Sequence, residues 1–160
     1  MRFVVAAIRL VEGGLRVAAA LCLFAMFALV IMQVALRYTG GGIPVFTEEA
    51  ARYAMIWSAL FATAVAVREN SHIHIDLLPA LLRALAPALA LALAFVLDVI
   101  SVGVFGVLFW QGIGAVTFAV GQRSEGLQIS LAWPYAALPV AFGFALLFAL
   151  ARLVLRDRLA

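Results

Sequence analysis

Val17–Leu36 reads VAAALCLFAMFALVIMQVAL, a run of 20 residues in which Gln33 is the one polar side chain. A helix needs about 20 apolar residues to cross the hydrocarbon core of a bilayer, so this run predicts a transmembrane helix. It is longer than the apolar region of a signal peptide, and three arginines precede it. We therefore expect a signal anchor that stays in the membrane.

The composition of the rest of the chain agrees with a membrane protein. Of its 160 residues 68% are hydrophobic and 12% are charged, whereas about a quarter are charged in a soluble domain. All eleven basic residues are arginines and they are dispersed along the chain, which argues against a nucleic-acid partner. The single cysteine, Cys22, lies inside the first apolar run, so we expect a small buried side chain and no internal disulfide.

Three further apolar runs complete the expected architecture. The third, residues 84–120, is too long to cross a bilayer straight, but its middle has no charge, proline or polar turn that could form a hairpin. We expect one long span there, preceded by an interfacial helix at residues 77–85 and a bend at Pro87. The prediction is an all-α integral membrane protein with one domain, residues 1–160, and four transmembrane helices at about residues 17–36, 50–67, 88–116 and 129–151.

The distribution of arginines predicts the orientation in the membrane. Eight of the eleven lie in the two tails and in the loop after the second span, and three lie on the other side. Cytoplasmic segments of membrane proteins carry the excess of basic residues. We therefore expect both termini in the cytoplasm, in agreement with an even number of spans.

A charged cluster opens the second span. In FTEEAARY, residues 46–53, Thr47 can cap a helix through its hydroxyl group. Glu48 and Glu49 then fall in the first turn, where the helix dipole favours acids, and Arg52 is placed for a helical ion pair with either. Two interpretations stay open: a well-capped helix start, or a docking site for another membrane subunit.

A second cluster, RENSHIHIDL at residues 68–77, follows the same span. His72, His74 and Asp76 alternate with isoleucines, so in an extended segment they would face one way. Three ligands in one short loop, without cysteine or further acids nearby, are a weak metal signal. We expect a structural loop or a contact with a partner, and no metal.

Polar residues within the spans are a third feature. Asp98 lies inside the third apolar run, and an intramembrane acid indicates a functional or interhelical role. A lone carboxylate makes a poor cation cage, so we favour a contact with another helix or subunit, with Ser101 as a possible local partner. Gln33 and Gln111 are expected to form interhelical hydrogen bonds.

No enzyme signature is present in the sequence. It contains no P-loop, nucleophile elbow or HExxH motif. A haem-binding bundle would place histidines within its spans, whereas both histidines here lie in one loop. We expect neither catalysis nor a cofactor.

Four motifs in order carry a family resemblance. They are QVALRY at residues 33–38, FTEEAARY at 46–53, VRENSHIHIDLL at 67–78 and RSEGLQISLAWPYAALPVAFG at 123–143. Together they resemble the DctQ-type small membrane subunit of tripartite ATP-independent periplasmic (TRAP) transporters. Ser130 stands where the family often has proline, and Ala141 and Ala62 stand where it often has glycine, which affects local bends and close packing.

The resemblance implies a role and a set of partners. Such subunits pair with a large multi-span permease in the inner membrane of bacteria, and a periplasmic solute-binding protein delivers the substrate. The large subunit would hold the substrate and ion sites of a symporter for organic acids such as dicarboxylates, keto acids or sugar acids. The small subunit would be a fixed scaffold in the lipid bilayer.

The candidate residues follow from these features. Those expected to contact another subunit are Arg37, Glu48, Glu49, Arg52, His72, His74, Asp76 and Asp98. Those expected to be structural are Tyr38, which with Arg37 anchors the end of the first span at the interface, and Thr47, Ser124, Tyr135 and Pro139.

Two other classes of protein stay open as alternatives. A small self-contained exporter of four spans usually carries a glutamate within its first span, and Val17–Leu36 has no acid. A membrane-anchored metal or redox protein would use His72, His74 and Asp76. Metal analysis of the purified chain separates that class from a transporter subunit.

Overall fold

The computed structural model describes residues 2–39, 45–69 and 87–154, and its elements are α-helices joined by turns. They are α1 (Arg2–Tyr38), α2 (Val45–Glu69), α4 (Pro87–Ala119), α5 (Ala132–Tyr135) and α6 (Ala137–Val154). Among these residues, four stretches are long and apolar enough to cross a membrane: Ala6–Tyr38, Val45–Glu69, Ala92–Ala119 and Ala132–Val154. The predicted all-α, four-span architecture is therefore confirmed. The interfacial helix expected at residues 77–85 lies outside the described residues.

The third span is a single helix, as the sequence predicts. α4 runs without a break from Pro87 to Ala119. Proline is tolerated at the first helical position because its missing N–H has no partner there in any case. After it the run contains no proline, and in lipid every backbone polar group must be satisfied within the helix.

The first helix begins earlier than the predicted span. α1 starts at Arg2, although the apolar run starts at Val17. Two contacts account for the extension: Arg16 pairs with Glu12 one turn away at 2.7 Å, and Ile8 and Leu15 are buried against other helices. The charged first segment is therefore part of the helix rather than a separate tail.

The fourth span is interrupted near its start. Residues 129–131 lie outside any helix, and the chain then forms the short α5 and the longer α6 with Ala136 between them. Pro139 cannot donate the backbone hydrogen bond that the Tyr135 carbonyl would accept in a continuous helix. Val140 N still donates to Ala136 O at 3.2 Å, so the two pieces follow nearly one axis.

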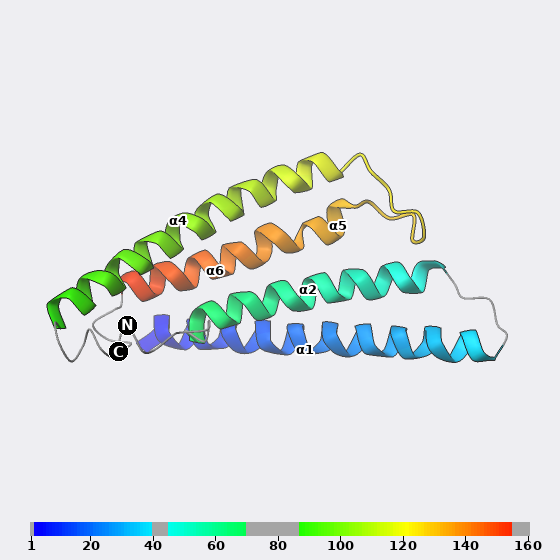
Figure 1. The fold of residues 1–160 in the computed structure, drawn as a ribbon, viewed down its shortest axis with the longest axis horizontal. Coiled ribbons are helices and arrows are strands. Elements are labelled where there is room, and N and C mark those ends of the chain that lie inside the picture. Colours follow the sequence, from blue (N-terminus) through cyan, green and yellow to red (C-terminus); the bar gives the residue numbers. More distant parts are fainter. Residues whose placement is uncertain (1, 40–44, 70–86, 155–160) are drawn as a thin grey trace.

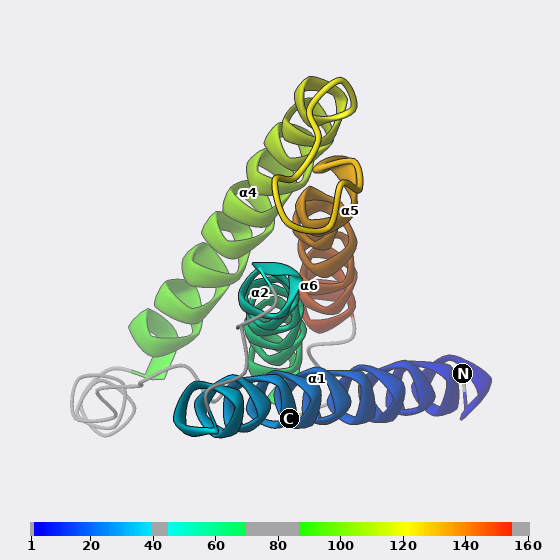
Figure 2. The same cartoon turned by 90° about the vertical axis from the view of Figure 1, so that its right-hand side faces the viewer.

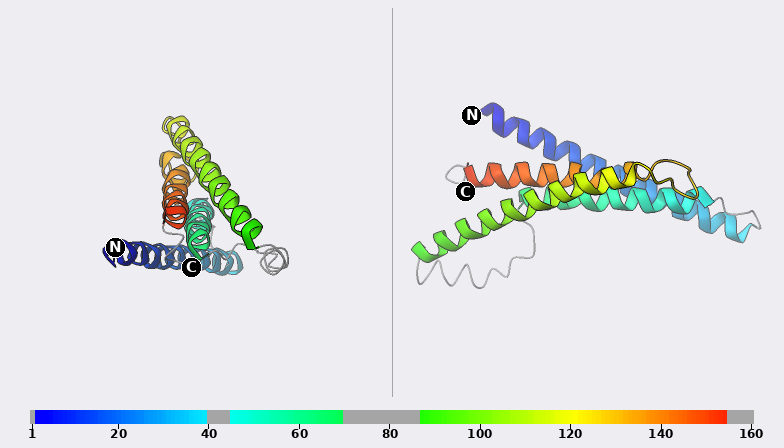
Figure 3. Two further views of the ribbon diagram at one scale, coloured as in Figure 1. Left: turned by 90° about the vertical axis from the view of Figure 1, so that its left-hand side faces the viewer. Right: turned by 90° about the horizontal axis from the view of Figure 1, so that it is seen from above.

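The helices form an open row rather than a closed bundle. α1 packs against α2, α2 against α6, and α6 against α4, so that α1 and α4 are the two edges (Figures 1 and 2). At one end of the row, called here the terminal end, α1 begins and α2 and α6 end. At the other, the loop end, α2 begins and α4 ends. Seen from above, α1 and α4 diverge on opposite sides of α6 at the terminal end (Figure 3, right).

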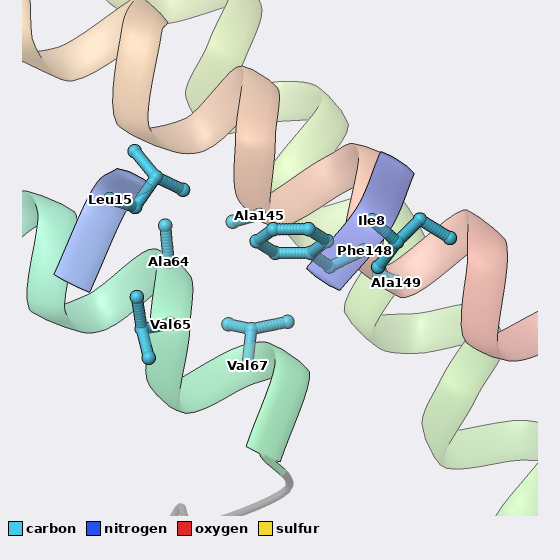
Figure 4. Packing of buried hydrophobic residues seen from close by; sticks show 8 residues of the cluster. All are labelled: Ile8, Leu15, Ala64, Val65, Val67, Ala145, Phe148 and Ala149. Carbon is cyan, nitrogen blue, oxygen red and sulfur yellow. The ribbon is translucent and has the colours of Figure 1, made fainter. Parts of the chain in front are cut away.

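The best-buried core lies towards the terminal end, where α1, α2 and α6 meet (Figure 4). Phe148 is 1% exposed and fills the space between small side chains. The cluster comprises Ile8, Leu15, Ala64, Val65, Val67, Ala145, Phe148 and Ala149. The alanines let the backbones approach closely, which is how membrane helices gain packing energy when lipid removes the hydrophobic driving force.

The contact between α4 and α6 also depends on small residues. A methyl group at Gly112 would lie 2.9 Å from the backbone nitrogen of Pro139, and one at Gly143 would lie 3.2 Å from the Phe109 ring. Ala141, where the DctQ family often has glycine, is 1% exposed. The glycines therefore set how near these two helices come.

Candidate functional site

The loop end carries a short hairpin between α4 and α5. Ser124 N donates to Ile129 O at 2.9 Å and Leu131 N donates to Gln122 O at 3.0 Å. Arg123 and Ser130 form an isolated antiparallel bridge. Gln128 has a φ of 56°, the left-handed conformation that closes a tight turn. This segment, residues 121–131, is called the outer hairpin below.

Glu49 fastens the outer hairpin to the start of α2. Its Oε2 atom accepts hydrogen bonds from the backbone N–H groups of Gly126 at 3.0 Å and Leu127 at 2.8 Å. Its Oε1 atom accepts one from the Tyr53 hydroxyl, one helical turn away, at 2.6 Å. Hydrogen bonds to an ionised acceptor are shorter and stronger than neutral ones. One carboxylate thus joins two segments that are 77 residues apart in sequence.

Close packing surrounds this carboxylate. A methyl group at Gly126 would lie 2.9 Å from Glu49 Oε2 and 3.1 Å from the Val45 carbonyl oxygen, so only glycine fits there without a shift. Ser124 is 3% exposed, and its hydroxyl accepts a second hydrogen bond from Leu127 N at 3.2 Å. The hairpin is therefore held in one position against α2.

Thr47 differs from the prediction for this segment. α2 begins at Val45, so Thr47 lies within the first turn rather than ahead of it as a cap. Its side chain is fully buried. This position within the helix differs from that of an N-cap residue, and the structural role expected for Thr47 stays a prediction.

Glu48 and Arg52 form the predicted helical ion pair. Arg52 Nη2 donates to Glu48 Oε1 at 3.0 Å, and the two side chains are 62% and 74% exposed respectively. An exposed pair of this kind contributes about 0–1 kcal/mol to stability. The two adjacent glutamates therefore have different surroundings: Glu48 faces outward, and Glu49 binds the outer hairpin.

An open pocket of about 390 Å³ lies over this junction. Both acidic and basic side chains line it, Glu48 and Arg52 from α2 and Arg123 and Glu125 from the outer hairpin. Arg123 Nη1 also donates to the Gln128 carbonyl at 3.3 Å. A rim of mixed charge around a rigid junction can bind a polar protein surface. Within the described ranges, no group of three or more His, Cys, Asp or Glu side chains is placed to hold a metal ion.

The terminal end has a charged network of its own, which the sequence analysis did not identify. Arg16 of α1 pairs with Glu12 on its own helix and with Glu69 at the end of α2. Arg68 Nε lies 3.8 Å from Glu12 Oε2, too far for a hydrogen bond but close enough for attraction. The four-residue spacing of Glu12 and Arg16 was the signal in the sequence that could have revealed part of it.

Asp98 pairs with an arginine from another helix. Its Oδ1 atom lies 2.8 Å from Nε of Arg152 on α6, and the two side chains are 13% and 27% exposed. Ser101, expected as a local partner, donates instead to the Leu97 carbonyl. The intramembrane acid thus makes a contact between α4 and α6. Its expected role at an interface with another subunit stays a prediction.

The spans contain further polar side chains, of which one forms an interhelical hydrogen bond and two do not. Ser58 of α2 donates to the Ala19 carbonyl of α1 at 3.0 Å, the interhelical bond that was expected of the glutamines. The Gln33 amide nitrogen is buried without a partner among the described residues. Gln111 is exposed on α4 and has no hydrogen-bond partner in the described part of the chain.

The remaining candidate residues are spread over the row. Arg37 and Tyr38 end α1 and are exposed, and Arg37 is placed favourably for the helix dipole. Tyr135 ends α5 and is 41% exposed, while Pro139 lies against Gly112. His72, His74 and Asp76 lie outside the described residues. Cys22 is partly rather than fully buried.

Comparison with known proteins assigns the family. Residues 26–159 match the model of the DctQ component of tripartite ATP-independent periplasmic transporters. Over 129 residues the chain is 27% identical to the isethionate TRAP transporter permease protein DctMQ of Oleidesulfovibrio alaskensis, covering 76% of this chain and 20% of that one. The chain therefore spans about a fifth of the length of this relative. As a transporter component with four apolar helices, it is a multi-pass inner-membrane protein and not an enzyme, and it belongs to the DctQ family of TRAP transporters.

Proposed function

We propose that the chain is the fixed small subunit that supports a larger permease chain, which imports an organic acid on an ion gradient. The observation that carries this proposal is the pairing of Asp98 with Arg152. An intramembrane carboxylate is the group that could coordinate a coupling cation, and here an arginine of the same chain neutralises it. Asp98 therefore holds two helices of this chain together, as expected of a scaffold subunit. In this proposal the ion and substrate sites belong to the larger partner.

The orientation is part of the proposal. α1 begins and α6 ends at the same end of the row (Figure 1), and the arginine excess favours that end as the cytoplasmic one. The outer hairpin and its charged pocket would then face the periplasm. A solute-binding protein approaches from that side, and Glu48, Arg52, Arg123 and Glu125 offer it a polar surface of mixed charge.

A pair of cysteine variants tests the orientation. Gly13 lies near the terminal end and Gly121 begins the outer hairpin, and both have open space around the position of a side chain. In a Cys22→Ser background, an impermeant maleimide added to intact cells should label Gly121→Cys and spare Gly13→Cys. Both should react after permeabilisation. Labelling of Gly13→Cys in intact cells would place the terminal end outside and refute the orientation.

The proposed class of substrate is inferred from the family and from one relative. The curated relative is named for isethionate, a small organic sulfonate, and this chain corresponds to only a fifth of that protein. We propose a small organic anion as the cargo of the complex. An uptake panel should therefore include dicarboxylates, keto acids, sugar acids and isethionate.

Reconstitution tests the subunit role. The chain alone in liposomes should move no organic acid, whereas the chain with its large permease and binding protein should accumulate one under an ion gradient. Glu48→Gln should weaken uptake driven by the binding protein while the large permease still copurifies, because Glu48 is exposed and holds no other segment. Transport by the chain alone would refute the proposal and favour the self-contained exporter.

A further inference from the structure

We propose that the Glu49 carboxylate is a proton-sensitive latch, which holds the outer hairpin against α2 while it is ionised and loosens the hairpin when it takes up a proton. The latch lies at the loop end of the row, where α2 begins and the outer hairpin connects α4 to α5 (Figure 1). It is a property of this chain alone, so it does not depend on the proposed function.

Three hydrogen-bond donors converge on the Glu49 carboxylate. The backbone N–H groups of Gly126 and Leu127 donate to Oε2 at 3.0 and 2.8 Å, and the Tyr53 hydroxyl donates to Oε1 at 2.6 Å. An ionised carboxylate has acceptors only, and its hydrogen bonds are roughly twice as strong as those of a neutral group. The ionised form of Glu49 is therefore the form that holds the two segments together.

A proton taken up by this carboxylate has one position that disturbs the contacts little. On Oε2 it would point at two N–H groups, so that donor would face donor. On Oε1 it can be donated to the Tyr53 oxygen, once the tyrosine hydroxyl turns its own hydrogen away. Oε2 is then a neutral carbonyl oxygen, and its bonds to Gly126 and Leu127 lose the assistance of the charge. Proton uptake therefore weakens the contact with the hairpin and leaves α2 intact.

The open pocket at this end of the row depends on the same contact. Its charged lining comes from two segments, with Glu48 and Arg52 on α2 and Arg123 and Glu125 on the outer hairpin. The bonds of Glu49 join these two segments. A loosened hairpin therefore changes the spacing of the charges around the pocket.

The loop end contains other groups that could respond to pH. Its charged and titratable side chains are Arg37 and Tyr38 on α1, Glu48, Arg52 and Tyr53 on α2, Arg123 and Glu125 on the outer hairpin, and Tyr135 on α5. Arginine and tyrosine keep their protons between about pH 7 and pH 3.5, whereas glutamates titrate within that range. Glu48 pairs with Arg52 on its own helix, and Glu125 is exposed. These two glutamates are the alternatives to Glu49 that a test must separate.

Nuclear magnetic resonance of the purified chain in detergent, with isotope-labelled glycine, can follow the latch. Between about pH 7 and pH 3.5, the amide resonance of Gly126 should shift with one midpoint. Its hydrogen exchange, relative to the intrinsic rate at each pH, should become several-fold faster. Gly143 lies against the Phe109 ring where α4 and α6 pack together, so its amide reports unfolding of the whole chain. Its protection should stay unchanged over the same range.

Four variants assign the midpoint to one side chain. Glu49→Gln places an amide oxygen and an amide N–H where the protonated carboxyl has its carbonyl oxygen and its O–H, so Gly126 should exchange at the fast rate at every pH. Tyr53→Phe removes the donor to Oε1, so loosening should begin about one pH unit higher, a ten-fold change in proton affinity. Glu48→Gln and Glu125→Gln are the controls and should keep the native titration of Gly126.

The latch is wrong if Gly126 keeps its resonance and protection down to about pH 3.5, or if Glu49→Gln titrates as the native chain does. It is also wrong if Gly143 loses protection at the same midpoint, because the transition is then acid unfolding of the whole chain. If Glu49→Gln does not fold, Tyr53→Phe decides the question. A midpoint that moves to higher pH supports the latch, and a midpoint that does not move contradicts it.

Discussion

The two ends of the helix row are held together in different ways. At the terminal end three helices bury a cluster around Phe148, and charged pairs join α1 to α2 and α4 to α6. At the loop end one carboxylate, that of Glu49, joins α2 to the outer hairpin through directional hydrogen bonds beside an open pocket. Packing distributes its energy over many contacts, whereas the loop end depends on a few polar atoms. The terminal end should therefore decide whether the chain folds, and the loop end what shape it presents to a partner.

The largest effect is expected at the terminal end. Phe148→Ala removes a side chain that is 1% exposed and leaves a cavity among alanines. Phe→Ala in a packed core costs about 3–5 kcal/mol, and the cost here should approach the lower part of that range because lipid removes part of the transfer term. Thermal unfolding of the detergent-solubilised chain measures it. Phe24→Ala, at a position 73% exposed, is the control and should change the melting temperature little.

A smaller effect is expected from Gly126→Ala at the loop end. The added methyl group would lie 2.9 Å from Glu49 Oε2 and 3.1 Å from the Val45 carbonyl, so the hairpin must move away from α2. We expect a loss of about 1–2 kcal/mol, typical of a local backbone shift. Faster protease cleavage within residues 121–131 measures the movement. Gly121→Ala, which has open space, should cleave at the native rate, and equal rates for both variants would contradict the close approach.

The smallest effect on stability should come from the adjacent glutamates, and their difference sharpens the comparison. Glu49→Gln keeps an oxygen acceptor but loses the charge that strengthens the bonds to Gly126 N and Leu127 N. Amide hydrogen exchange at those two residues should become several-fold faster. Glu48→Gln should leave it unchanged, because Glu48 pairs with Arg52 on its own helix and not with the hairpin. Equal exchange in the two variants would mean that Glu49 does not hold the hairpin.

The sequence predicts the helices well because membrane spans are set by local composition. The unbroken α4 follows from an apolar run without a proline or polar turn after Pro87. The early start of α1 was missed because Arg2, Arg9 and Arg16 resemble a charged tail, and the burial of Ile8 depends on helices far along the chain. Local patterns do not contain that information.

Long-range pairing was the part that could not be predicted. Asp98 and Glu49 were both singled out, but their partners lie on other segments: Arg152 for Asp98, and Gly126 with Leu127 for Glu49. A single sequence gives no spacing rule between residues on different helices. The order in which the helices pack decides these pairs, and the row α1–α2–α6–α4 differs from the order along the chain. Thr47 was misplaced for a simpler reason, since helix starts are uncertain by one or two residues.

That difference in order has a consequence for biogenesis. A ribosome makes α2 directly after α1, so these two neighbours can associate as soon as both are in the bilayer. α4 must wait for α6, an interval of about 2–7 s at synthesis rates of about 5–20 residues per second. Throughout that delay the Asp98 carboxylate is in the membrane before its counter-ion Arg152 has been translated. The third span therefore enters the bilayer with an acid whose counter-ion is still to be made, which is a costly group at that depth.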